Sequence, residues 1–323
     1  MLQQIRIALQ KNKLPYYAKN LIRQIIPAGL YEHSLKRKLI SLKHYNKTEI
    51  QSRVNYYNKL EKPVSISEKA IQLKDMQMFK SPKTYNFDTF EYTRYFTKTL
   101  KASFVFGDVI HTPPEPTIQK SRPVAGNNAN AVLLKLDKKR HFVFVKDNKP
   151  FASKKDMLIG RSAVNQPHRV RFMELYFNHP LCDLGQVNKT GGNIAWLKPK
   201  ISISEHLQYK FILSLEGYDV ATNLKWIMSS NSIAVMPKPK YETWFMEGRL
   251  IPNVHYILIK DDYSDLEERL NHYLNSPQDA QVIIKNANEY VKQFLDKRKE
   301  DLISLLVLEK YFYCTLQLEK ISG

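Results

Sequence analysis

The sequence predicts an α/β fold with a mainly parallel sheet in its second half. Short apolar runs such as FILSL (residues 211–215) and IAVMP (residues 233–237) alternate with stretches of helical periodicity, which is the pattern of strand–helix units. Hydrophobic residues make up 43% and charged residues 25% of the 323 residues, as in globular proteins. A chain of this length can form two domains of ordinary size.

Residues 1–60 are predicted to be mostly helical. Apolar residues recur at spacings of three and four in LIRQIIPAGLYEHSLKRKLI (residues 21–40), a run that Pro27 interrupts. Residues 1–50 contain ten Lys and Arg against two Glu, so this stretch carries +8 of the formal net charge of +19. Such a charge favours polyanions. No nucleic-acid-binding signature is present. We therefore expect an anionic membrane or glycolipid partner and no nucleic acid, with a solvated basic face as the alternative.

Short strands are expected from about residue 84 onward. ASFVFGD ends at Asp108 and precedes the segment TPPEP, which interrupts regular structure. AVLLKLD (residues 131–137) and RHFVFVKD (residues 140–147) are predicted to form a hairpin, and DMLIGRS (residues 156–162) to form a further strand. The loop-rich segment KDNKPFASKKD, residues 146–156, is a candidate domain boundary.

The second half continues with predicted helices. QPHRVRFMELYFN (residues 166–178) follows the DMLIGRS strand, and one long helix is expected over residues 279–312. Ser264 and Glu267 have the spacing of a helix capping box. These elements complete the alternation of strands and helices.

The turn EGYDVATN (residues 216–223), which follows FILSL, is a candidate phosphate site. Asp219 is predicted to be the N-cap of a helix that starts at Val220, and Gly217 to permit a tight backbone path. A helix N-terminus offers free N–H groups and partial positive charge to a phosphate. An ordinary capped helix is the alternative. The candidate binding residues are Glu216, Gly217, Val220, Ala221, Thr222, Asn223 and Lys225.

Several classes of protein are excluded by absent motifs. The sequence has no GxxxxGK[ST], GxGxxG, HExxH or DxD motif, and its nine histidines show no metal-ligand spacing. No apolar run reaches the ~18 residues that a membrane-spanning helix needs. The N-terminus lacks the features of a signal peptide, and the two cysteines form no CxxC motif. A cytoplasmic protein is expected.

Two long segments carry a resemblance to a known family. LEGYDVATNLKWIMSSNSIAVMP, followed by WFMEGRLIPNVHYILIKDDYSDLEERL, resembles the signature region of glycosyltransferase family 90. KSRPVAGNNANAVLLKLDKKRHFVFVKD and FASKKDMLIGRSAVNQPHR are similar to its bacterial lipopolysaccharide core glycosyltransferases, which are related to capsule-associated proteins and protein O-glucosyltransferases. The likeness covers roughly residues 100–295.

The resemblance implies a GT-B architecture, with two Rossmann-like domains facing across a cleft. Residues 1–153 would form the acceptor-side domain, residues 154–295 the nucleotide-sugar-binding domain, and residues 296–323 a helix packing back on the first. It also implies an inverting transfer of a hexose from a UDP-sugar to an anionic lipid A–core acceptor, with no metal or other cofactor. The protein would be peripheral on the cytoplasmic face of the inner membrane.

The same resemblance implies roles for individual residues. Asp108 takes the position of the family's catalytic base. GRSA (residues 160–163), which includes Ser162, takes the position of the family's Arg-Gly turn. Here the order is reversed, because Gly160 precedes Arg161. Either Arg161 or Arg169 would therefore face the diphosphate, with Lys225 as a further cation. Alternatives are a glycosyltransferase of capsule synthesis and a non-catalytic basic membrane- or polyanion-binding protein that retains the fold.

Overall fold

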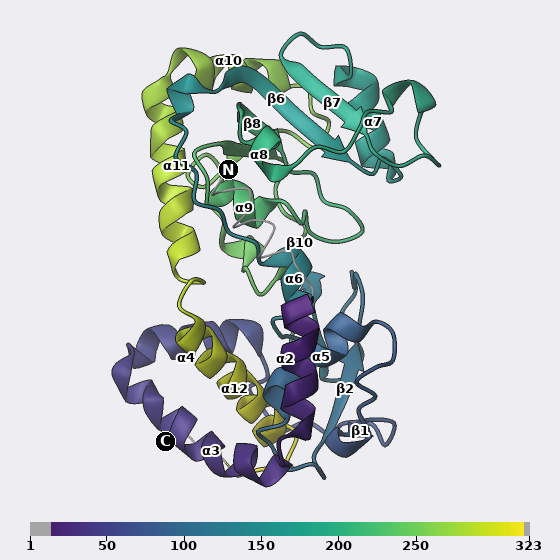
Figure 1. The fold of residues 1–323 in the computed structure, drawn as a ribbon, viewed down its shortest axis with the longest axis vertical. Coiled ribbons are helices and arrows are strands. Elements are labelled where there is room, and N and C mark those ends of the chain that lie inside the picture. Colours follow the sequence, from purple (N-terminus) through teal and green to yellow (C-terminus); the bar gives the residue numbers. More distant parts are fainter. Residues whose placement is uncertain (1–13, 320–323) are drawn as a thin grey trace. The chain divides into compact units, whose positions relative to one another are not determined.

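The computed structural model describes residues 14–319 and divides them into two compact units (Figure 1). The five-stranded unit consists of residues 140–239 and 248–293. The helix-rich unit consists of the remaining described residues, 14–139, 240–247 and 294–319. Two short crossings thus return the chain to the helix-rich unit after residue 239 and after residue 293.

All strands of the five-stranded unit run parallel, which confirms the predicted α/β class. Their order across the sheet is β11-β9-β8-β6-β7. In chain order this is the 2-1-3-4-5 arrangement of doubly wound sheets, whose order reverses between the first and third strands, here β6 and β8. The strands are β6 (Lys155–Ser162), β7 (Cys182–Gln186), β8 (Tyr209–Leu213), β9 (Ile233–Met236) and β11 (Ile257–Leu258).

The core of this unit is built from nearly continuous apolar strands, as expected for a sheet covered by helices. Leu158, Phe211 and Val235 are buried there with Phe172 of the following helix, and each such side chain contributes about 1.5–3 kcal/mol. The helices are α7 (Pro167–Tyr176), α8 (Ile203–His206), α9 (Leu224–Met228), α10 (Leu266–Asn275) and α11 (Pro277–Lys292), with 3-10 turns at Phe151–Ser153 and Ile194–Trp196. A further 3-10 turn, Glu247–Arg249, includes the point where the chain re-enters this unit.

The helix-rich unit contains a smaller sheet and most of the long helices. Its four-stranded sheet has the order β1-β2-β3-β5, in which β2, β3 and β5 are parallel and β1 is antiparallel. The strands are β1 (Ile71–Gln72), β2 (Lys101–Val105), β3 (Thr117–Gln119) and β5 (Ala131–Leu133). A separate antiparallel pair joins β4 (Ser121–Pro123) to β10 (Tyr241–Thr243).

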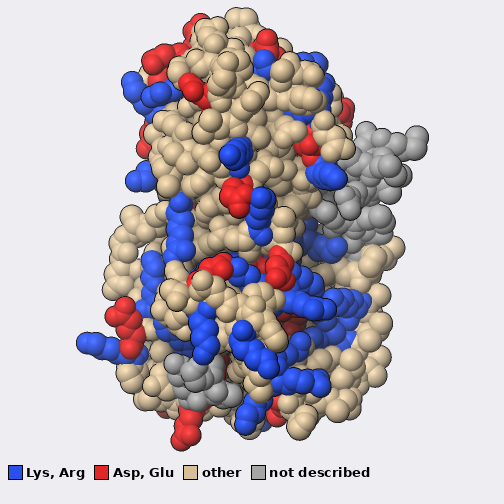
Figure 2. Space-filling view, turned by 90° about the vertical axis from the view of Figure 1, so that its left-hand side faces the viewer, with Lys and Arg blue, Asp and Glu red and all other residues tan. Residues whose placement is uncertain are grey.

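The predicted helical start of the chain is confirmed for the described residues. The helices of this unit are α2 (Leu14–Ile25), α3 (Ala28–Ile40), α4 (Lys47–Tyr57), α5 (Lys83–Thr93) and α12 (Lys297–Cys314), with 3-10 turns at Ser41–His44 and Leu73–Asp75. Helix α12 packs against α4 and α5 and is buried along most of its length. Figure 2 shows Lys and Arg side chains gathered over the lower, helix-rich part of one face. Within residues 14–319, no helix has the length and apolar character needed to cross a bilayer.

Two predicted elements are wrong, and each has an electrostatic reason. Residues 131–147 form no hairpin, because the four-residue helix α6 (Lys138–His141) follows β5, and Lys138 is held by Asp88 and Glu91. The single helix over residues 279–312 is divided between α11 and α12. Asp296 causes the break, since its side chain accepts hydrogen bonds from the N–H groups of Arg298 and Lys299 and so caps a new helix.

Another predicted helix start is also displaced. Helix α10 begins at Leu266, and its N-cap is Asp265, with no side-chain cap bond. The Ser264 hydroxyl instead donates a 2.9 Å hydrogen bond to Asp262. The predicted capping box of Ser264 and Glu267 is therefore wrong.

Candidate functional site

The carboxyl ends of β6 and β8 mark the point where the order of the five-stranded sheet reverses. Ligands of doubly wound sheets bind outside the carboxyl ends of the strands at this switch point. The chain leaves β6 at Ser162 and enters α7 at Pro167, and it leaves β8 at Leu213. The segments after these two strands are therefore the first place to look for a ligand site.

Arg169, on the first turns of α7, joins the two segments. Its Nη1 donates to the carbonyl oxygen of Ala163 after β6, at 2.8 Å. Its Nε and Nη2 donate to the carbonyl oxygens of Glu216 and Leu215 after β8, each at 2.8 Å. One guanidinium group thus fixes the backbone on both sides of the switch point, and three of its five N–H groups donate these hydrogen bonds.

The charge of Arg169 has no carboxylate partner among the described residues. Its hydrogen bonds go to backbone carbonyl oxygens. Burial lowers its pKa to about 10, while the neighbouring Tyr263 hydroxyl opposes that change. A half-buried cation without an acidic partner attracts an anion more strongly than a paired one does. The geometry therefore provides a positive centre at the switch point.

His168 and Tyr263 support the same arrangement, although no motif in the sequence predicted them. The Nε2 atom of His168 lies 2.9 Å from the carbonyl oxygen of Glu216. The Tyr263 hydroxyl donates a 3.1 Å hydrogen bond to the carbonyl oxygen of His168. The available signal in the sequence was the position of His168 next to Arg169, in the helix that Pro167 begins after β6.

Arg161 has a different environment. It lies within β6, where its Nη2 pairs with the Asp183 carboxylate at 2.7 Å and its Nη1 donates to the Asp183 carbonyl oxygen at 2.7 Å. Lys198 contacts the same carboxylate at 3.0 Å. The charge of Arg161 is therefore already compensated by Asp183.

The segment GRSA does not form the expected turn. Gly160, Arg161 and Ser162 are the last residues of β6 and pair with β7. Gly160 is needed for packing, because a Cβ atom there would lie 2.9 Å from Leu184 Cδ2. The prediction that these residues occupy a turn is wrong, and the turn begins after Ser162.

The turn EGYDVATN also differs from its prediction. Helix α9 starts at Leu224, so a helix that begins at Val220 with Asp219 as N-cap is wrong. The N–H group of Gly217 donates to the Asp219 carbonyl oxygen at 2.8 Å, and the Asp219 side chain is buried. Asn223 stands before the helix, where its amide donates to the Leu213 carbonyl oxygen at 2.9 Å. The turn is therefore an irregular loop tied to the end of β8.

The predicted phosphate ligands of this turn fall into two groups. Val220, Ala221 and Lys225 are buried, and Lys225 is 0% exposed, so an anion could reach its ammonium group only if the turn moved. Glu216, Gly217, Thr222 and Asn223 are partly exposed. Tyr218, which the sequence did not single out, is 65% exposed beside them. The accessible part of the turn thus consists of its first residues together with Thr222 and Asn223.

The predicted base, Asp108, belongs to the helix-rich unit. Strand β2 ends at Val105, and Gly107 turns the chain with φ 123° just before Asp108. The Asp108 carboxylate forms an ion pair with Lys120, which follows the neighbouring parallel strand β3. Its side chain keeps 24% of its surface exposed, so a ligand can reach it.

Other titratable groups surround this ion pair at the same edge of the sheet. Burial raises the pKa of the Tyr85 hydroxyl to about 12. The charge of Lys120 opposes that rise, and the charges of Asp137 and Asp108 add to it. Asp137, which follows β5, has a positive φ of 50°. The carboxyl edge of β2, β3 and β5 is thus a polar cluster on a parallel sheet, as at β6 and β8.

Comparison with known proteins identifies the family. Residues 127–311 match the profile of glycosyl transferase family 90. The chain belongs to this family. As a member of family 90, it is a glycosyltransferase, as the resemblance predicted. The match includes Arg169 and the turn at residues 216–223, whereas Asp108 lies before it.

One relative of this family 90 member matches it over nearly its whole length. It is 42% identical over 306 residues to O-glucosyltransferase LpsA of Dichelobacter nodosus, a match covering 94% of this chain and 96% of that protein. Shorter matches are to uncharacterized protein 035R of Invertebrate iridescent virus 3 (29% over 100 residues) and 179R of Invertebrate iridescent virus 6 (27% over 115 residues). These cover 30% and 32% of this chain and 9% and 10% of the viral proteins.

Proposed function

We propose that this family 90 enzyme is an inverting hexosyltransferase that uses a UDP-sugar donor and extends the core of lipopolysaccharide. Its similarity to an O-glucosyltransferase named LpsA over nearly its whole length supports this class of reaction and makes glucose the first sugar to test. The proposal includes a GT-B arrangement and a peripheral location at the cytoplasmic face of the inner membrane.

The observation that carries the proposal is the environment of Arg169. A cation that has no carboxylate partner within residues 14–319, fixed at the switch point of a doubly wound sheet, is suited to a nucleotide diphosphate. Three of its N–H groups are used by backbone carbonyls, so the remaining two can donate to a phosphate oxygen. Arg169, rather than Arg161, is therefore our candidate for neutralising the leaving diphosphate. Glu216, Gly217, Thr222 and Asn223 would line the donor on the same side.

Asp108 would act on the acceptor. Its carboxylate would take the proton from an acceptor hydroxyl as the hydroxyl oxygen attacks the anomeric carbon. The bond between that carbon and the UDP oxygen breaks from the opposite side, so the configuration inverts, and UDP leaves as an anion. Lys120 orients the carboxylate through the ion pair. In this mechanism protein cations, with no metal ion, stabilise the developing phosphate charge.

The test is a set of UDP-sugars offered with lipopolysaccharide from a strain that lacks this enzyme. We expect one UDP-hexose to be consumed, the core to gain one hexose by mass spectrometry, and the rate to survive EDTA. The anomeric configuration of the product, read by NMR, should be opposite to that of the donor. No transfer from any UDP-sugar would remove the proposal, and retention of configuration would remove the role of Asp108.

A further inference from the structure

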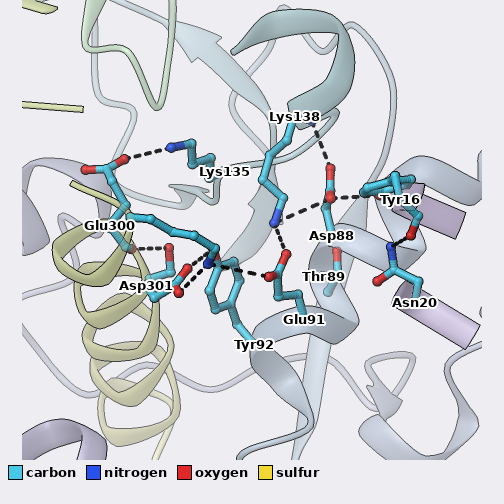
Figure 3. Close-up of polar contacts among 12 residues, drawn as sticks. Tyr16, Asn20, Asp88, Thr89, Glu91, Tyr92, Lys135, Lys138, Glu300 and Asp301 are labelled. Atoms are coloured by element: carbon cyan, nitrogen blue, oxygen red, sulfur yellow. Dashed lines mark hydrogen bonds and ion pairs between the residues drawn. The ribbon is translucent and has the colours of Figure 1, made fainter. Parts of the chain in front are cut away.

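Helix α2 turns its polar side chains toward the protein. Tyr16 donates a 3.1 Å hydrogen bond to the Thr84 carbonyl oxygen. It also donates a 2.8 Å hydrogen bond to the Asp88 carboxylate (Figure 3). Asn20 is 1% exposed, and Arg23 is 8% exposed and forms an ion pair with Glu91. These three residues lie four and three positions apart, so they share one face of the helix. The buried face of α2 is therefore its polar face.

Lys138 fixes the acidic partners on which α2 rests. Its ammonium group pairs with Glu91 and lies 3.4 Å from Asp88, and its backbone N–H donates to Asp88 at 2.9 Å (Figure 3). Asp88 and Glu91 lie on α5 and are both buried. Turning α2 about its axis would leave these buried charges without Tyr16 and Arg23, and an uncompensated buried charge is strongly unfavourable. The orientation of α2 is thus held by charge.

The opposite face of α2 is apolar and exposed. Leu14, Leu21, Ile22 and Ile25 are 77%, 47%, 60% and 81% exposed. Measured from Leu14, they stand seven, eight and eleven positions along the helix, which places them on one face. Ile26 and Leu30, which follow in the turn and at the start of α3, are also exposed. We call these six residues the α2 apolar face.

The exposed charged side chains of α2 and of the segments that follow it in the chain are mainly basic. Lys19 of α2 is exposed, as are Lys36 and Arg37 of α3, and Lys43 and Lys47 after it. The acidic residues among residues 14–50 are Glu32 and Glu49, and Glu49 pairs with Lys299. An exposed face of isoleucine and leucine, in a segment of the chain rich in Lys and Arg, is the pattern of helices that lie in the interface of an anionic membrane.

We propose that the α2 apolar face inserts into the headgroup region of an anionic phospholipid bilayer. The inference deepens the membrane location given under the proposed function, and it makes apolar insertion, rather than charge alone, the main source of affinity. Because α2 is fixed to α5 by buried charges, the apolar face is presented without refolding. The partner is a lipid surface because its acyl region can accept the apolar side chains while its anionic headgroups attract the basic side chains.

The main experiment is co-sedimentation of the full chain, without sugar donor, with vesicles of phosphatidylcholine with and without phosphatidylglycerol. We expect binding to the anionic vesicles that high salt weakens but does not abolish. The variant Ile22→Ser/Ile25→Ser should lose about tenfold or more in partition coefficient. The matched control Ile194→Ser/Val282→Ser, at two exposed positions of the five-stranded unit, should bind like the wild type.

A label gives a second measurement on the same face. Both native cysteines are buried, and burial raises the pKa of the Cys182 thiol to about 12 and raises that of Cys314. A polarity-sensitive dye attached to an Ile22→Cys variant should therefore report this position. We expect its emission to shift to the blue on addition of anionic vesicles, and no shift for the exposed control Val282→Cys.

Three results would overturn the inference. The first is that Ile22→Ser/Ile25→Ser binds vesicles as well as the wild type does. The second is that the dye at position 22 shows no shift in emission. The third is that the serine variant loses self-association of the chain but still binds vesicles. The last result would assign the face to a second copy of the chain. None of these results bears on sugar transfer, which is measured with donor and acceptor in detergent, so the two proposals can fail separately.

Discussion

Asp108 and Lys120 form an ion pair beyond the carboxyl ends of two neighbouring parallel strands, β2 and β3. The side chain of Lys120 is 1% exposed and that of Asp108 is 24% exposed. The buried ammonium group has a fixed position, so it holds the carboxylate in place while part of the carboxylate stays accessible. This is the arrangement that a positioned general base requires.

Replacing Asp108 with Asn should abolish sugar transfer. The amide keeps the shape of the side chain but cannot accept the acceptor's proton, and loss of a general base typically costs ~100- to 10,000-fold in rate. UDP binding by calorimetry should remain. Since Lys120 loses its charged partner, we also expect a lower free energy of unfolding. Asp156→Asn, which removes the exposed partner of Lys210, is the matched control and should be active. Near-normal turnover by Asp108→Asn would place the base elsewhere.

Replacing Arg169 with Lys should weaken UDP binding by ~1–3 kcal/mol, the scale of a charge-assisted hydrogen bond. Lysine keeps the charge but cannot donate to three carbonyl oxygens and a phosphate together. Binding of uridine, which has no phosphate, should change much less. Calorimetry with both ligands provides the measurement.

Two matched substitutions test the choice of arginine. Arg161→Lys keeps a cation beside Asp183, and Arg171→Lys lies on the exposed side of the same helix as Arg169. Both should bind UDP like the wild type. If Arg161→Lys loses UDP affinity and Arg169→Lys does not, the diphosphate is held by Arg161.

The acid stability of the five-stranded unit should depend on Asp183. Partial burial opposes ionisation of this carboxyl group, but hydrogen bonds from Tyr209, Arg161 and Lys198 outweigh burial and hold its pKa at about 2. A lowered pKa stabilises the fold above the ordinary value of ~4. That stability is lost as the pH falls from about 4 to about 2. Asp183→Asn should remove about 1 kcal/mol near neutral pH, after allowance for solvent screening.

Urea unfolding from about pH 7 down to about pH 3, followed by hydrogen exchange in β6 and β7, checks this prediction. The difference between Asp183→Asn and the wild type should shrink toward the acid end. Asp279→Asn, which removes an exposed carboxylate of the same unit, should show no such difference. A constant difference at every pH would mean that the charge of Asp183 is not responsible.

Glu300→Gln should destabilise the helix-rich unit by ~3–5 kcal/mol. The carboxylate of Glu300 pairs with Arg53 at 2.6 Å and with Lys135 at 3.0 Å, and accepts a 2.7 Å hydrogen bond from Trp244. Burial favours the neutral acid, but Lys135 and Arg53 outweigh it and lower the pKa of Glu300. Asp301→Asn, at the next and partly exposed position of the same helix, should cost under ~1 kcal/mol by thermal unfolding. Equal effects of the two variants would contradict the prediction.

Much of the five-stranded unit could be predicted from sequence because its signals are local. The apolar runs that became β6, β8 and β9, and the helix α7, follow from hydrophobic periodicity and length. The start of α9 could not be predicted. Its position depends on Asn223, whose amide bonds to Leu213, ten residues earlier, in the folded chain.

The sequence alone determined the family, the α/β class and the basic character of the N-terminal region. The tertiary structure decided that Arg161, and not Arg169, is paired with a carboxylate of the described part of the chain. Asp183 is 22 residues from Arg161 and near it only in the fold. The tertiary structure also decided the orientation of α2. Helical periodicity fixes which residues share a face but not which face is buried. The buried face is set by Asp88 and Glu91, which lie 72 and 68 residues from their partners Tyr16 and Arg23. Leaving a buried carboxylate without a polar partner costs more free energy than leaving an isoleucine exposed to water.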